Sequence, residues 1–229
     1  MTVTATNEDG VLLVTLDDGK MNAITHEVID GLQVALDKAA AEATAVCLRG
    51  NERALSAGFD LAVMTGPPEG MRALVAAGAE LLLRLWVHPQ PTVVAMTGHA
   101  LAAGALLLLA CDTRVATNGP AKVGLNEVPI GLALPEFAYE MATARLSKRF
   151  LTRAALQGEI FDPAGAMAAG YVDRVEADCV SAALADARRL GELPAAAYAR
   201  TKRSLRQPMA DRVLASLRAH ATGSAITPD

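Results

Sequence analysis

Hydrophobic residues recur in two different patterns along the first 120 positions of the chain. Short apolar runs bounded by turn residues predict buried strands. They lie at residues 11–18, 45–50, 92–98 and 113–117. Apolar residues at helical spacing predict amphipathic helices over 25–43, where Thr25 is a candidate N-cap, and over 67–91, which ends at Pro89 and Pro91. This alternation is typical of an α/β protein with mostly parallel strands.

The pattern changes after about residue 134. Only 171–175 still has the character of a strand, and the segment 135–220 has helical spacing interrupted by proline and glycine. The predicted helix breaks lie at Pro163, Gly170, Pro194 and Pro208. We therefore expect a strand-rich part followed by a helical C-terminal part, with a frayed tail over 221–229.

One run, AMTGHALAAGALLLLACD at residues 95–112, is almost entirely apolar or glycine. Three interpretations compete: a membrane segment, a core helix, or a turn whose small residues let another group come close. The uninterrupted apolar part, residues 100–111, is twelve residues long and ends before Asp112. A helix that spans a bilayer needs about 20 residues, so we expect no membrane segment here.

Composition narrows the classes of function. Hydrophobic residues make up 52% of the 229 residues but aromatic ones only 3%, so the core must be built from Ala, Leu and Val. The net charge of −4 and the lack of a basic patch argue against nucleic-acid binding. Three cysteines without a CxxC pair, and histidines without acidic or thiol partners, argue against disulfides and metal sites. The first ten residues lack the features of a signal peptide, so we expect a cytoplasmic protein.

Two predicted strand-to-helix junctions carry small residues. LSAGFDL occupies 55–61, and TGHALAAGA occupies 97–105 at the end of the strand 92–98. A helix start offers unpaired N–H groups and the positive end of the helix dipole. Two such N–H groups aimed at one point form an oxyanion hole. The alternative is that Gly58, Gly98 and Gly104 serve only tight turns and helix packing.

A glutamate in an apolar loop is the third candidate feature. Glu127 lies in GLNEVPIGLALP, residues 124–135, between the strand 113–117 and a helix that starts near Pro135. A carboxyl group among apolar neighbours has a raised pKa and can act as a general acid or base. The alternative is an exposed loop glutamate or a helix-capping partner.

Together these segments resemble the crotonase, or enoyl-CoA hydratase/isomerase, superfamily. The resemblance runs from DDGKMNAIT (17–25) through AAGYVDRV (168–175), and LSAGFDL, GHALAAGALLLLACD and NEVPIGLALP follow the family's order and spacing. The chain looks most like the short actinobacterial enoyl-CoA hydratases. The resemblance implies an α/β fold made of a spiral of ββα units over residues 1–175. Residues 176–229 would then form a shortened helical trimerisation region.

The resemblance also implies roles for individual residues. Members of the family bind acyl-CoA thioesters and stabilise an enolate with two backbone N–H groups, which by motif position are those of Phe59 and Ala103. Glu127 matches a catalytic glutamate of the family. The substrate-binding positions implied by the same motifs are Ala57, Gly58, Asp60, Leu61, Gly104, Leu106 and Lys20. Lys20 would meet a phosphate of coenzyme A or be a solvated turn residue.

The chain departs from the family at one catalytic position. Hydratases of the family hold the attacking water between two glutamates, and Leu106 stands where the second would be. Leucine cannot orient a water or transfer a proton. Glu136, nine residues after Glu127, is the nearest substitute acid, or simply a favourable first-turn residue of a helix.

Three functions therefore remain open at this point. The family label favours hydration of a 2-enoyl-CoA, and the single glutamate favours a Δ3,Δ2-enoyl-CoA isomerase. The third alternative is an inactive acyl-CoA-binding protein. The resemblance implies no metal and no cofactor, since coenzyme A is part of the substrate. It further implies a homotrimer, or a hexamer of two trimers, with neither nucleic acid nor a membrane as partner.

Overall fold

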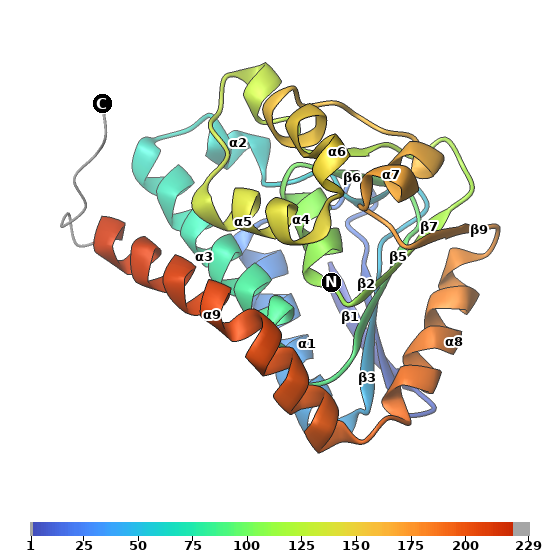
Figure 1. Ribbon diagram of the computed structural model, residues 1–229. Helices are drawn as coiled ribbons and strands as arrows, with labels where there is room; N and C mark the ends of the chain where they lie inside the picture. Colours follow the sequence, from blue (N-terminus) through green and yellow to red (C-terminus); the bar gives the residue numbers. More distant parts are fainter. Residues whose placement is uncertain (1, 222–229) are drawn as a thin grey trace.

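The computed structural model describes residues 2–221, which form two sheets wrapped by helices (Figure 1). The larger sheet has the strand order β1-β2-β3-β5-β7-β9, and all its pairs are parallel except β1 with β2. Its strands are β1 (Val3–Glu8), β2 (Val11–Leu16), β3 (Ala45–Arg49), β5 (Thr92–Met96), β7 (Thr113–Thr117) and β9 (Arg174–Glu176). The smaller, parallel sheet consists of β4 (Ala54–Ser56), β6 (His99–Leu101) and β8 (Val123–Gly124).

Helices follow the strand pairs. After β2 comes α1 (His26–Glu42); after β3 and β4 come α2 (Leu61–Met64) and α3 (Pro68–Trp86); after β5 and β6 comes α4 (Ala103–Ala110). The later elements are a 3₁₀ turn (Val128–Ile130), α5 (Glu136–Arg145), α6 (Lys148–Leu151), a π-helical turn (Thr152–Leu156), α7 (Pro163–Ala169), α8 (Cys179–Gly191) and α9 (Ala195–Ala221). Each turn of the chain thus adds one strand to each sheet and then a helix. The predicted α/β spiral of ββα units is confirmed.

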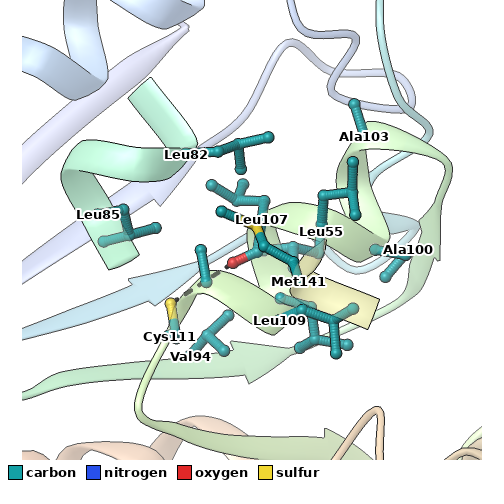
Figure 2. Close-up of a cluster of buried hydrophobic side chains, with 14 of the residues drawn as sticks. Leu55, Leu82, Leu85, Val94, Ala100, Ala103, Leu107, Leu109, Cys111 and Met141 are labelled. Carbon is teal, nitrogen blue, oxygen red and sulfur yellow. Dashed lines mark hydrogen bonds between the residues drawn. The ribbon is translucent and has the colours of Figure 1, made fainter. Parts of the chain in front are cut away.

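Helix α4 is the centre of the core. All eight of its residues are buried, as expected for a helix that is apolar on every side. Figure 2 shows Leu107 and Leu109 of α4 among Leu55, Leu82 and Met141, which come from three other elements. The core-helix interpretation of the apolar run is therefore correct. No helix among residues 2–221 is long and apolar enough to cross a membrane.

Helix α9 is tied to the sheet by one buried carboxylate. The side chain of Asp112, just before β7, pairs with Lys202 at 2.7 Å and Arg206 at 2.6 Å and accepts the Tyr198 hydroxyl at 2.8 Å. It also accepts the backbone N–H of Thr92 at the start of β5. Burial alone would raise the pKa of Asp112, but the charges of Lys202 and Arg206 lower it overall. The carboxylate therefore stays ionised.

One predicted helix break is wrong. Helix α9 continues through Pro208, although a proline inside a helix removes a hydrogen bond and strains the preceding turn. Contacts on both sides of the proline hold the helix in place. Arg206 is stacked on the Trp86 ring before it, and Met209 and Val213 are buried after it. Tertiary packing therefore outweighs the local preference of proline.

The C-terminal part consists of two helices with different surroundings. Helix α8 packs on one face of the larger sheet, against β3, β5 and β7, whereas α9 runs across α3 on the other side (Figure 1). The boundary predicted after residue 175 falls within β9. The trimerisation role of the following segment stays a prediction, and the tail from residue 222 onward lies outside the described residues.

We predict that Asp112→Asn lowers the free energy of unfolding by about 3 kcal/mol, because it leaves the buried cations Lys202 and Arg206 without a counter-charge. Urea unfolding followed by circular dichroism measures this. Asp37→Asn is the matched control, since the Asp37–Arg84 pair is exposed and contributes about 0.5 kcal/mol or less. Equal losses in both variants would contradict an anchoring role for Asp112.

We also predict acid destabilisation from His88. Burial, helped by the charge of Lys202, lowers the pKa of His88 from 6.5 to about 4. Between these values the unfolded chain binds a proton that the native protein does not bind. Stability is therefore lost as the pH falls, by about 3 kcal/mol at pH 4. Urea unfolding between pH 7 and pH 4 should show this slope, and the slope should flatten in His88→Gln; parallel profiles would exclude His88 as its source.

Candidate active site

The fold brings the two strand-to-helix junctions side by side. A Cβ atom placed on Gly58 would lie 3.4 Å from the backbone nitrogen of Ala103. The contact is possible because α4 begins directly against β4. A methyl group on Gly104 would lie only 2.1 Å from the carbonyl oxygen of Ser56, so only glycine fits there. The junction predicted directly after the strand 92–98 is in fact separated from it by the short strand β6.

The N–H groups of Phe59 and Ala103 are both free for a ligand. Ile24 exchanges backbone hydrogen bonds with Gly58 and Asp60, which turns the intervening N–H of Phe59 away from Ile24. Ala103 is the first residue of α4, where the helix offers no acceptor. Within residues 2–221, neither amide donates to a protein acceptor. This is the arrangement that an oxyanion hole requires.

The residue before the second donor has an unusual backbone. Ala102 has φ +48° and ψ −124°, a conformation that glycine adopts freely and that strains a residue with a Cβ. Its N–H donates to the Gly124 carbonyl at 2.9 Å, and its own carbonyl accepts from Ala105 and Leu106. These bonds hold the strained turn that starts α4 and fixes the direction of the Ala103 N–H.

An apolar cavity of about 200 Å³ adjoins these amides. Its lining residues come from the first junction, α2, α3, α4, the loop after β8 and the start of α5: Phe59, Met64, Met71, Val75, Leu106, Glu127, Leu132, Ala133, Pro135 and Phe137. Glu127 is the only titratable side chain among them. Its Oε2 is buried and has no hydrogen-bond partner within the described residues. Burial raises the pKa of Glu127, which makes its carboxylate a stronger base.

The other predicted site residues fall into two groups. Leu106 lines the cavity, as does the side chain of Phe59, whereas the Ala57 N–H binds the Met21 carbonyl and Asp60 caps α2 through the N–H groups of Ala62 and Val63. Leu61 is 71% exposed at the start of α2. These contacts give Ala57 and Asp60 structural roles beside the site.

Two weaker candidates lie away from the cavity. Glu136 is the first residue of α5 and does not line it, although its neighbours Pro135 and Phe137 do. Lys20 is exposed in the turn after β2, where its carbonyl accepts from Asn51. The surface position of Lys20 neither adds to the cavity nor closes it.

Several wall residues were not singled out in the sequence. Met71 and Val75 are one helical turn apart on α3, and their apolar spacing indicated only a core-facing helix. Nothing along the chain connects them with Glu127, about 50 residues further on. The cysteines behave as predicted: Cys47, Cys111 and Cys179 are free and buried, and burial raises the pKa of each thiol.

The fold and the paired amides define a spiral α/β protein with a candidate oxyanion hole, and comparison with known proteins gives the family. The enoyl-CoA hydratase/isomerase family model matches residues 6–224. The chain therefore belongs to this family, as the sequence resemblance indicated. The solved structure of an enoyl-CoA hydratase/isomerase family protein from Pseudomonas syringae superposes with a TM-score of 0.93 at 39% identity, covering 98% of both chains.

Curated relatives carry names of two activities. A probable enoyl-CoA hydratase of Mycobacterium avium is 31% identical, over 91% of this chain and 84% of the relative. The human mitochondrial enoyl-CoA delta isomerase 1 is 29% identical, over 90% of this chain and 70% of the relative. Against the rat and mouse counterparts the match covers 60% and 59% of their length, less than two thirds.

We predict that Ala102→Gly stabilises the protein by about 1 kcal/mol, because glycine removes the strain at φ +48° and loses only part of that gain through its freer unfolded state. Thermal and urea unfolding measure this. The control is Ala105→Gly, a buried helical position where glycine should cost about 1 kcal/mol or more. If both variants lose stability, the Ala102 backbone is not strained.

Proposed function

We propose that this protein is an enoyl-CoA isomerase that converts 3-enoyl-CoA thioesters into 2-enoyl-CoA thioesters. The observation that carries the proposal is the single carboxylate of Glu127 in an otherwise apolar cavity beside two free backbone N–H groups. Moving a double bond by one position requires one base and one site for negative charge. It requires no second acid and no bound water.

The reaction follows from these groups. The thioester oxygen accepts hydrogen bonds from the N–H groups of Phe59 and Ala103, and the Glu127 carboxylate removes a proton from C2. The electron pair of that C–H bond delocalises onto the thioester oxygen, where the two amides stabilise the charge. Glu127 then returns the proton to C4, and the double bond forms between C2 and C3. Removing one oxyanion donor typically costs an enzyme about 3–4 kcal/mol of transition-state stabilisation.

The apolar walls support the same chemistry. A carboxylate without hydrogen-bond partners is a stronger base than a solvated one, and burial raises the pKa of Glu127 accordingly. The walls also keep bulk water away from the dienolate, so that the proton held by Glu127 returns to carbon.

Hydration of a 2-enoyl-CoA is the second candidate, and the hydratase names among the relatives favour it. Against it stands Leu106, which lines the cavity where family hydratases have their second glutamate. The third possibility, acyl-CoA binding without turnover, is an outcome of the assay below.

The remaining expectations belong to the same proposal. The enzyme would need no metal or cofactor beyond the coenzyme A of its substrate. Among residues 2–221 no three His, Cys, Asp or Glu side chains are grouped to hold a metal. We further propose a cytoplasmic homotrimer or hexamer, which light scattering on the purified protein tests directly.

We predict that Glu127→Gln lowers kcat on a 3-enoyl-CoA by about 10³-fold with a small change in KM, because the amide cannot accept the proton. Spectrophotometric turnover of 3-enoyl-CoA and 2-enoyl-CoA thioesters measures this. Faster turnover of the 2-enoyl substrate by the wild type would favour hydration over isomerisation. Binding of both thioesters without turnover would contradict an enzymatic role.

The pH profile gives an independent check. The wild-type kcat/KM should rise with pH through the pKa of Glu127, at a pH above the value of about 4.3 for an exposed glutamate. Residual activity of Glu127→Gln should lack this rise. Glu140→Gln, which alters a surface partner of Arg212 outside the cavity, should keep both the rate and the profile of the wild type.

A further inference from the structure

The aromatic ring of Phe59 stands between helix α3 and the cavity. On one side the ring lines the cavity together with Leu106 and Glu127. On the other side it lies against Gly78 of α3, where a Cβ atom would be 2.3 Å from Cε1 and 2.5 Å from Cζ of the ring. The residue that supplies an N–H to the candidate oxyanion hole therefore also supplies, through its side chain, a wall of the cavity.

Gly78 is the position on α3 that makes room for the ring. Met71, Val75 and Gly78 follow one another at helical spacing on the same face, and Met71 and Val75 line the cavity directly. At Gly78 the missing side chain leaves a notch that the Phe59 ring fills. A Cβ there would need the ring to move by roughly an ångström to reach ordinary contact distance. The open volume lies on the cavity side.

We propose that the Phe59–Gly78 pair sets the length of acyl chain that this protein accepts. The inference rests on the proposed function in one respect, namely that the cavity receives the acyl group of a coenzyme A thioester. A volume of about 200 Å³ holds about six or seven methylene-sized groups at ~30 Å³ each. Acyl chains of about six carbons therefore fit, and longer ones meet the wall.

The walls differ in how readily they yield. Met64 and Met71 are flexible and adapt to an occupant, whereas an aromatic ring seated in a notch of its own shape has little freedom. The ring therefore sets the limit that the methionines cannot set. A further contribution comes from Leu106, whose side chain occupies the place of a shorter-range polar contact in family hydratases.

The test compares acyl-length preference within each variant, so that a general loss of activity cancels. For Gly78→Ala we expect the ratio of kcat/KM for a ten-carbon to a six-carbon 3-enoyl-CoA to fall at least about tenfold, because the ring is pushed into the cavity. For Phe59→Leu, which keeps the backbone N–H, we expect the same ratio to rise by about tenfold or more.

A double variant and a matched control isolate the pair. In Phe59→Leu the side chain is too short to meet a Cβ at position 78, so adding Gly78→Ala should change the ratio little. Gly70→Ala is the control: it is the same substitution on the same helix, and its Cβ would lie 4.0 Å from the nearest atom, in Val63. It should leave the ratio as in the wild type.

Calorimetric binding of saturated six- and ten-carbon acyl-CoA thioesters separates this inference from the proposed function. If the Kd ratio shifts as expected while no variant turns over an enoyl-CoA, the length limit stands and the isomerase proposal fails. The inference is overturned if folded Gly78→Ala keeps the wild-type ratio. It is equally overturned if the shift is the same in the Phe59→Leu background, or if no acyl-CoA binds at all.

Discussion

The close approach of the start of α4 to strand β4 is the constraint on which the site depends. The two backbones touch at Gly104 and Ser56, where even a methyl group would not fit. This contact brings the Phe59 and Ala103 amides to one place, and the strained backbone at Ala102 directs the second of them. Small residues in this segment are therefore a requirement of backbone geometry, and the cavity lies where the geometry leaves space.

The rest of the core keeps this contact rigid. Helix α4 is surrounded by apolar side chains on every side, so it cannot shift without exposing them. Behind it the Asp112 carboxylate joins the starts of β5 and β7 to helix α9. Polar groups are concentrated in that anchor, whereas the cavity has one carboxylate. The difference leaves Glu127 without partners and therefore strongly basic.

The sequence predicted the elements whose signals are local. The apolar runs of β2, β3, β5 and β7 and the helical spacing of α1 and α3 were all recognised. It did not predict β4, β6 and β8, because strands of two or three residues have no periodicity of their own. Strand β1 was missed for a related reason: its alternating polar residues make it an edge strand, held by pairing with β2.

By itself the sequence determined the family motifs, the single glutamate at 127 and the leucine at 106. Only the tertiary structure decided which of these residues share a cavity. It gave Asp60 to a helix cap and left Glu136 outside, and it joined Phe59 to Gly78. The physical reason is that motif spacing fixes contacts along the chain, whereas cavity walls arise where elements distant in sequence pack. Their shape depends on side chains, such as the Phe59 ring and the missing one at Gly78, that meet only in the folded protein.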